Sequence, residues 1–144
     1  IRQSAWRNGI QISPSTVQSW VQNIAKGNST ADHYKQLVRK QAQTLAPGYA
    51  NELDSGMDLY DIASPYLQSK AKILEQNPAD IDLFDPDVRK ALSSKDAQGK
   101  PSTVSLSQFE TQMRSKPEWM KTAAAQDQAM SMGHTVLRDF GFVT

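Results

Sequence analysis

The sequence predicts an all-α fold, an irregular bundle of six to eight short helices in a single domain. Two observations lead to this prediction. Apolar residues recur at the three- and four-residue spacing of amphipathic helices along most of the 144 residues. Residue pairs that begin or end helices, such as Ser13-Pro14 and Asn77-Pro78, divide the chain into short segments. No segment shows the sustained alternation of a β-strand, so helices are the regular elements we expect.

The first third of the chain predicts three helices. Residues 1–8 are the end of a helix that stops at Asn8-Gly9, because both residues tolerate a positive φ. A second helix follows Ser13-Pro14, where the serine is the N-cap and the proline occupies the first turn. A third helix follows the N-cap Thr30 and ends before Pro47-Gly48.

Apolar side chains line one face of each of the two longer helices in this region. Those of the second helix are Val17, Trp20, Val21 and Ile24, and those of the third are Tyr34, Leu37, Val38 and Leu45. We expect both faces to be core. Replacing Trp20 with alanine should then lower the free energy of unfolding by about 3–5 kcal/mol. The same reasoning places Phe109 and Leu137 in the core.

The middle of the chain predicts shorter elements. Residues 49–54 form a short helical turn, and Asp58 is placed to cap a helix that continues to residue 74. Ser64-Pro65 either restarts or kinks that helix. The apolar connector 81–84 should pack against the core. Asp85, which precedes a proline, should cap the next helix.

The C-terminal third begins with a polar segment. Residues 95–103 contain a glycine and a proline and are predicted to be a flexible loop or hairpin. Ser105 should cap the following helix, which Lys116-Pro117 ends. The last helix should extend from about residue 118 to Phe140, with the tail to Thr144 after it.

Composition excludes several classes of function. Sixteen basic and fifteen acidic residues give a net charge of +1, so no strong field attracts a polyanion, and specific nucleic-acid binding is not expected. No apolar run approaches the roughly 20 residues of a membrane span. The absence of cysteine excludes disulfides and thiol chemistry. The chain begins without methionine or a signal peptide, and we expect it to be a fragment of a much longer chain.

Acidic residues and two histidines are the candidates for chemistry. The acidic cluster consists of Asp80, Asp82, Asp85 and Asp87. It is better explained structurally than by a cation site, because Asp85 should cap the helix that begins at Pro86 and Asp82 alternates with apolar residues in the connector. The separate Gly99 segment does not form an EF-hand motif, since Ser105 stands where such a loop needs a glutamate at its last position. His33 and His134 are a hundred residues apart, and neither has a second ligand one helical turn away. We therefore predict no catalytic, cofactor or metal residues and no enzymatic activity.

Several strings in order along almost the whole chain resemble the C-terminal part of large virion proteins from tailed phages of actinobacteria, of the tape-measure or minor-tail type. These strings are Trp6-Arg7-Asn8-Gly9, Asp61-Ile62-Ala63-Ser64-Pro65-Tyr66-Leu67, Ile81-Asp82-Leu83-Phe84-Asp85-Pro86, Lys90-Ala91-Leu92, Leu106-Ser107-Gln108-Phe109-Glu110, Arg114-Ser115-Lys116-Pro117-Glu118-Trp119 and Asp139-Phe140-Gly141-Phe142. The resemblance implies a non-enzymatic structural segment in the tail or tail tip of the virion. It also implies that its partners are other tail proteins and further copies of itself.

Two other functions remain open. One is an internal virion or DNA-ejection protein, and the other is a cell-wall binding or lytic module, for which Glu52 and Asp54 would be the carboxylate pair. A module that works by assembly needs exposed aromatic or methionine anchors. The candidate interaction residues are Trp119, Met130, Phe140 and Phe142. We expect residues 118–144 to contact other subunits more than residues 13–45 do.

Overall fold

The predicted all-α fold is confirmed by the computed structural model, which describes residues 1–142. Within these residues the chain forms eight α-helices and three 3₁₀ helices. In chain order they are α1 (Arg2–Arg7), α2 (Pro14–Ala25), α3 (Ala31–Leu45), η1 (Pro47–Tyr49), α4 (Ala50–Asp54), α5 (Leu59–Ile73), η2 (Pro78–Asp80), α6 (Pro86–Leu92), α7 (Leu106–Arg114), η3 (Pro117–Lys121) and α8 (Ala123–Asp139). Val143 and Thr144, part of the segment predicted to contact other subunits, lie outside the described residues.

Side-chain caps begin four helices, α2, α3, α6 and α7, where the sequence predicts them. Ser13 accepts a hydrogen bond from the third residue after it, Thr16, at 3.1 Å, and Thr30 caps α3 in the same way at 3.2 Å. Asp85 accepts from two backbone N–H groups of α6, and Ser105 forms a reciprocal capping box with Gln108. These bonds satisfy N–H groups that have no partner within the helix, so the boundaries are set locally.

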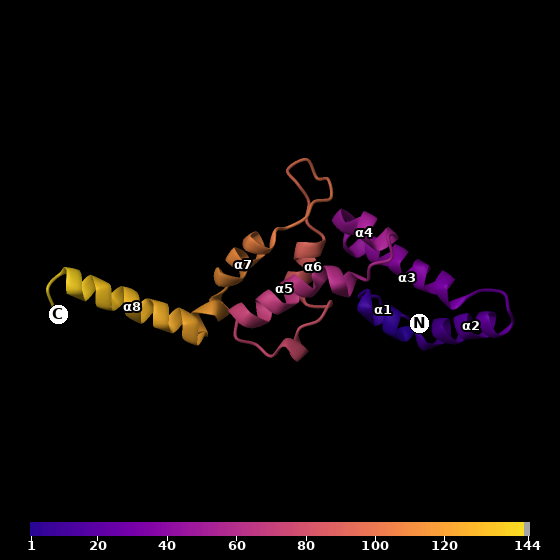
Figure 1. Cartoon of the computed structure of the whole chain (residues 1–144), viewed down its shortest axis with the longest axis horizontal. Helices are drawn as coiled ribbons and strands as arrows, with labels where there is room; N and C mark the ends of the chain where they lie inside the picture. The colour runs from indigo at the N-terminus through magenta and orange to yellow at the C-terminus, as the bar shows by residue number, and fades with distance from the viewer. Residues whose placement is uncertain (143–144) are drawn as a thin grey trace.

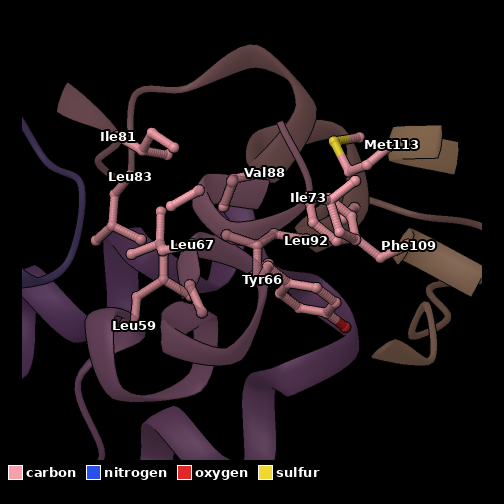
Figure 2. Packing of buried hydrophobic residues seen from close by; sticks show 14 of the residues in the cluster. Leu59, Tyr66, Leu67, Ile73, Ile81, Leu83, Val88, Leu92, Phe109 and Met113 are labelled. Atoms are coloured by element: carbon pink, nitrogen blue, oxygen red, sulfur yellow. The ribbon is translucent and has the colours of Figure 1, made fainter. Parts of the chain in front are cut away.

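Helix α5 is the centre of the core. Its buried face is covered by α7, by α6 and by the connector before α6, and Figure 2 shows these side chains meeting around Leu67 and Tyr66. The connector residues Ile81 and Leu83 are buried, as predicted. Phe109 of α7 is fully buried and packs edge-on against Tyr66, with ring centroids 5.0 Å apart. One contiguous cluster thus joins elements from α3 to α7.

The remaining helices extend from this centre in two directions. Helices α2 and α3 form a hairpin at one end of the molecule, and α8 projects from the other end (Figure 1). Helix α1 ties this hairpin to the centre by packing against both α3 and α5. Helix α4 packs against α3 and contributes Leu53 to the core cluster. Helix α8 contacts mainly η3. The two ends therefore differ in how much of their surface the chain itself covers.

The face around Trp20 is less buried than the sequence predicts. Val17 is buried, but Trp20 is half-buried and Val21 is 52% exposed. The indole stacks on the ring of Tyr34 at 4.6 Å, so it packs on one side and meets solvent on the other. Because Trp20 is not fully buried and its neighbour Val21 is exposed, truncation removes fewer contacts than at a core site, and we expect Trp20→Ala to lower the free energy of unfolding by only about 2 kcal/mol in a denaturant titration.

The start of α5 differs from the prediction. Asp58 occupies the N-cap position, but its carboxylate accepts no hydrogen bond from the helix. Instead the buried side chain of Asn8, from the end of α1, accepts from the backbone N–H of Leu59 at 3.0 Å. Helix α5 then continues through Pro65 without restarting. A residue 51 positions earlier in the chain therefore caps the central helix.

Two C-terminal predictions are refined. The sequence is compatible with either a flexible loop or a hairpin at residues 95–103. The structure forms the hairpin, which is closed by an antiparallel bridge between Lys95 and Pro101. The last helix does not begin near residue 118: η3 ends at Lys121, and Thr122 then adopts an extended conformation and caps α8 through the N–H of Ala125 at 3.1 Å. This cap separates the final helix from the segment that packs on the core.

Candidate docking surface

Helix α8 is attached to the core at its first turn. The carboxylate of Glu75, just beyond α5, accepts hydrogen bonds from the backbone N–H groups of Ala123 at 2.6 Å and Ala124 at 3.4 Å. A carboxylate at a helix N-terminus satisfies unpaired donors and interacts favourably with the helix dipole. Glu75 itself has a φ of 52°, a left-handed conformation that non-glycine residues rarely adopt. This unfavourable backbone conformation therefore occurs at the residue that binds the first turn of α8.

Beyond this attachment, α8 is exposed. Ala125 is its only buried residue, and every later residue of the helix is exposed. Five apolar side chains nevertheless lie on it or directly after it, and they are Met130, Met132, Val136, Leu137 and Phe140. Leu137, which the sequence placed in the core, is 47% exposed, because α8 projects away from the core and does not fold back over it.

The exposed apolar residues share one face of α8. At 100° per residue they fall, with Ala129 and Gly133, within an arc of roughly 160°. Asp127, Ser131 and Arg138 occupy the opposite face. A surface helix normally buries its apolar face against its own chain. In the described part of this protein α8 has no such cover, so its apolar face is available to another molecule.

The structure separates the four candidate interaction residues. Met130 is 73% exposed, Phe140 75% and Phe142 76%, and all three lie on the projecting segment. Trp119 instead lies in η3, half-buried against the core cluster. Sequence reasoning did not single out Val136 as part of the surface, nor Glu75 as its support. Gly133, in mid-helix among apolar residues, was the signal available for such a face.

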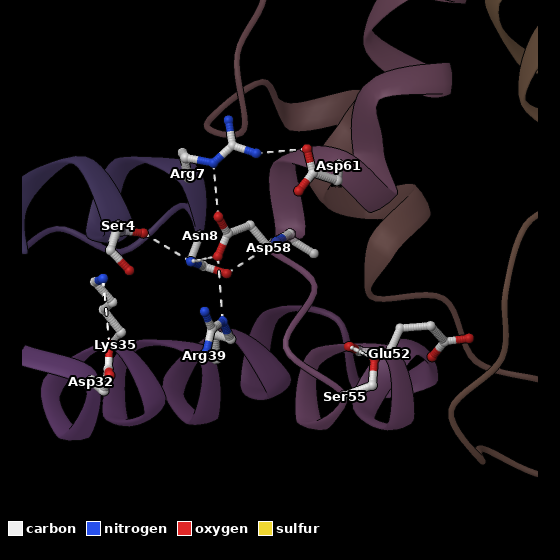
Figure 3. Close-up of polar contacts among 11 residues, drawn as sticks. Ser4, Arg7, Asn8, Asp32, Lys35, Arg39, Glu52, Ser55, Asp58 and Asp61 are labelled. Carbon is white, nitrogen blue, oxygen red and sulfur yellow. Dashed lines mark hydrogen bonds and ion pairs between the residues drawn. The ribbon is translucent and has the colours of Figure 1, made fainter.

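Two polar clusters away from α8 are structural. Figure 3 shows the first, in which the carboxylate of Asp58 accepts from Arg7 Nε at 2.8 Å and from Asn8 Nδ2 at 2.9 Å. Arg39 lies 3.4 Å away on the same carboxylate, and Arg7 also pairs with Asp61. This cluster joins α1, α3 and α5.

In the second cluster, Lys70 of α5 is buried between two carboxylates. Its Nζ donates to Asp85 at 2.6 Å and to Asp87 at 2.7 Å, and Lys116 reaches Asp87 at 2.9 Å from the other side. The acidic segment thus holds α6 against α5, in agreement with the structural role predicted for it. Within residues 1–142, no group of three acidic or histidine side chains is arranged to hold a metal ion.

These ion pairs make stability dependent on pH. Burial raises the pKa values of Asp58 and Asp87, but hydrogen bonds and charges from Arg7 and Asn8 at Asp58, and from Lys70 and Lys116 at Asp87, outweigh it and hold both below the ordinary value. A carboxyl group with a lowered folded-state pKa stabilises the protein above its unfolded pKa and loses that contribution as the pH falls.

We therefore expect the free energy of unfolding to decrease as the pH falls below about 4. Denaturant titrations between pH 2.5 and 7 would measure the slope. Asp87→Asn should flatten it, whereas Asp80→Asn, at an exposed position without a cation partner, should leave it unchanged. Equal slopes for the wild type and Asp87→Asn would contradict this assignment.

The residues considered for catalysis lie apart or at the surface. Glu52 and Asp54 are both exposed on α4, and Asp54 accepts a hydrogen bond from Gln43 at 2.5 Å. His33 lies in α3 beside a hollow of about 470 Å³ that Arg39 and Asp54 also line. His134 lies on α8, far along the chain. Glu52 and Asp54 therefore lie on a short helix in contact with solvent.

No protein-family model matches the sequence, and no curated protein or solved structure matches it significantly. None of the described helices is both long enough and apolar enough to cross a lipid bilayer.

Proposed function

We propose that this chain is a non-enzymatic assembly module of a tailed-phage virion, of the tape-measure or minor-tail type, located in the tail or tail tip. The order of strings along the sequence supports the virion assignment. The observation that supports assembly is the apolar face of α8, which is exposed for most of the length of the helix. Other tail proteins are the partners that this proposal implies.

The chemistry of this face is suited to binding protein. Methionine side chains adapt to irregular partner surfaces, and aromatic side chains at an edge are frequent anchors of interfaces. Met130, Met132 and Phe140 supply both kinds within three turns of helix. Exposed apolar patches of more than a few hundred Å² are uncommon on isolated proteins and are typical of interaction sites.

Particles of the phage that encodes this chain would test the virion assignment. We expect mass spectrometry of gradient-purified particles to detect its peptides in the tail fraction. A phage carrying Met130→Ser with Phe140→Ser should produce fewer complete tails, while Ser131→Ala, on the opposite face of α8, should assemble normally. Absence of the chain from purified particles would overturn the proposal. Binding to peptidoglycan, or salt-dependent binding to DNA, would instead favour a lytic or an ejection role.

A further inference from the structure

The apolar face of α8 carries both small and large residues. Along the middle of its apolar face lie, in order, Ala129, Gly133, Val136 and Phe140. The two small residues are one helical turn apart, and so are the two large ones. Small side chains therefore occupy the half of this face nearer the core, and large side chains occupy the half nearer the C-terminus. Ala125, closer to the core, is buried and takes no part.

Gly133 is not explained by the fold of the single chain. A Cβ atom added there would meet nothing within 4 Å, so no neighbouring segment requires its small size. Glycine inside a helix is destabilising relative to alanine. A position of this kind is expected where another backbone approaches closely.

We propose that α8 binds the α8 of a second copy of this chain, with the two helices antiparallel; this inference rests on the proposed function and names the first partner of the same face. An antiparallel pair centred between His134 and Thr135 places Phe140 of each copy over Ala129 of the other. The same register places Val136 over Gly133. Each large side chain thus meets a small one, as dense packing requires.

The opposite orientation does not give this fit. In a parallel pair, Phe140 would lie level with Phe140 of the partner, and Gly133 level with Gly133. Large residues would then hold the helices apart where the small ones leave space unfilled, which forfeits packing contacts. Both orientations are compatible with two-fold symmetry, so the packing of large residues against small ones decides between them.

The exposed area reaches what the smaller stable dimers bury. A large side chain offers roughly 150–250 Å² when fully exposed, so the five exposed apolar residues from Met130 to Phe140 present on the order of 600 Å². The smaller stable interfaces bury about 600 Å² on each partner. Asp127 and Arg138 lie on the opposite face of α8 and Asp139 lies at the edge of the apolar face, so no charged group falls in the middle of the contact.

Sedimentation equilibrium of the full chain tests the pairing. We expect a mass near twice 16.0 kDa at micromolar to submillimolar concentrations. Gly133→Leu should shift the protein to the monomer while leaving its helical circular dichroism intact, since the site has open space and leucine favours a helix. Ser131→Leu, which adds the same side chain to the opposite face, should remain dimeric. A dimeric Gly133→Leu would overturn the close contact at this glycine.

Cysteine cross-linking tests the orientation, because the chain has no cysteine of its own. A mixture of Ala129→Cys and Phe140→Cys should form a disulfide between the two variants, whereas Ala129→Cys alone should not. In the antiparallel pair the two copies of residue 129 are about 16 Å apart along the helix, beyond the reach of a disulfide. Cross-linking of Ala129→Cys with itself would refute the antiparallel arrangement.

A monomeric wild-type chain at every concentration would overturn the dimer without deciding the proposed function. The particle experiment decides that function separately. A chain found in purified tails whose assembly depends on Met130 and Phe140 would retain its virion role with a different protein on α8. A chain that dimerises but is absent from particles would retain the α8 pair and lose the virion role.

Discussion

Phe109→Ala is expected to lower the free energy of unfolding by about 3–5 kcal/mol, the largest effect of any truncation in this core. Phe109 is fully buried, and its ring packs against Tyr66 at the point where α7 meets α5. Removing the ring leaves a cavity that the surrounding helices fill only in part. It also loosens Tyr66, whose hydroxyl donates to the backbone carbonyl of Val104 before α7.

Urea unfolding of the wild type and the variant would measure this difference. Leu106→Ala is the matched control, because Leu106 lies one turn earlier on α7 and is exposed, and its truncation should cost well under 1 kcal/mol. If both variants lost similar stability, the assignment of Phe109 to the centre of the core would be wrong. A loss of this size would be a large fraction of the roughly 5–15 kcal/mol by which ordinary domains are stable.

Lys70→Met is expected to destabilise the protein by about 2–4 kcal/mol, because it leaves two carboxylates facing each other without their shared cation. Methionine retains much of the apolar stem, so most of the loss comes from the missing charge. The expected loss in the free energy of unfolding is smaller than for a fully buried ion pair, because Asp85 and Asp87 are partly solvated and Lys116 still reaches Asp87.

Lys72→Met is the matched control for this variant. Lys72 lies on the exposed side of the same helix, and its replacement should change stability by no more than about 0.5 kcal/mol. A double-mutant cycle with Asp87→Asn should give a favourable coupling energy between Lys70 and Asp87. A coupling energy near zero would show that the pair is held by packing of the helices and not by its charges.

The candidate docking surface was only partly predictable. Methionine and phenylalanine near the C-terminus indicated an interaction segment, and Met130, Phe140 and Phe142 lie on it exposed. Trp119 belongs to the same stretch of sequence but packs on the core, because the extended Thr122 separates η3 from α8. Composition alone could not distinguish Trp119, which packs on the core, from the exposed residues of the α8 segment. That distinction depends on where the chain turns away from the core.

The sequence by itself determined the helical class and most helix starts, since Ser13, Thr30, Asp85 and Ser105 each cap backbone groups within three residues. Such bonds depend only on local spacing. Only the tertiary structure decided which apolar faces are buried. Asn8 caps a helix 51 positions away, and the apolar face of α8 meets no part of the described chain that could cover it. Burial depends on contacts between distant segments, and helical periodicity marks an apolar face without specifying its partner.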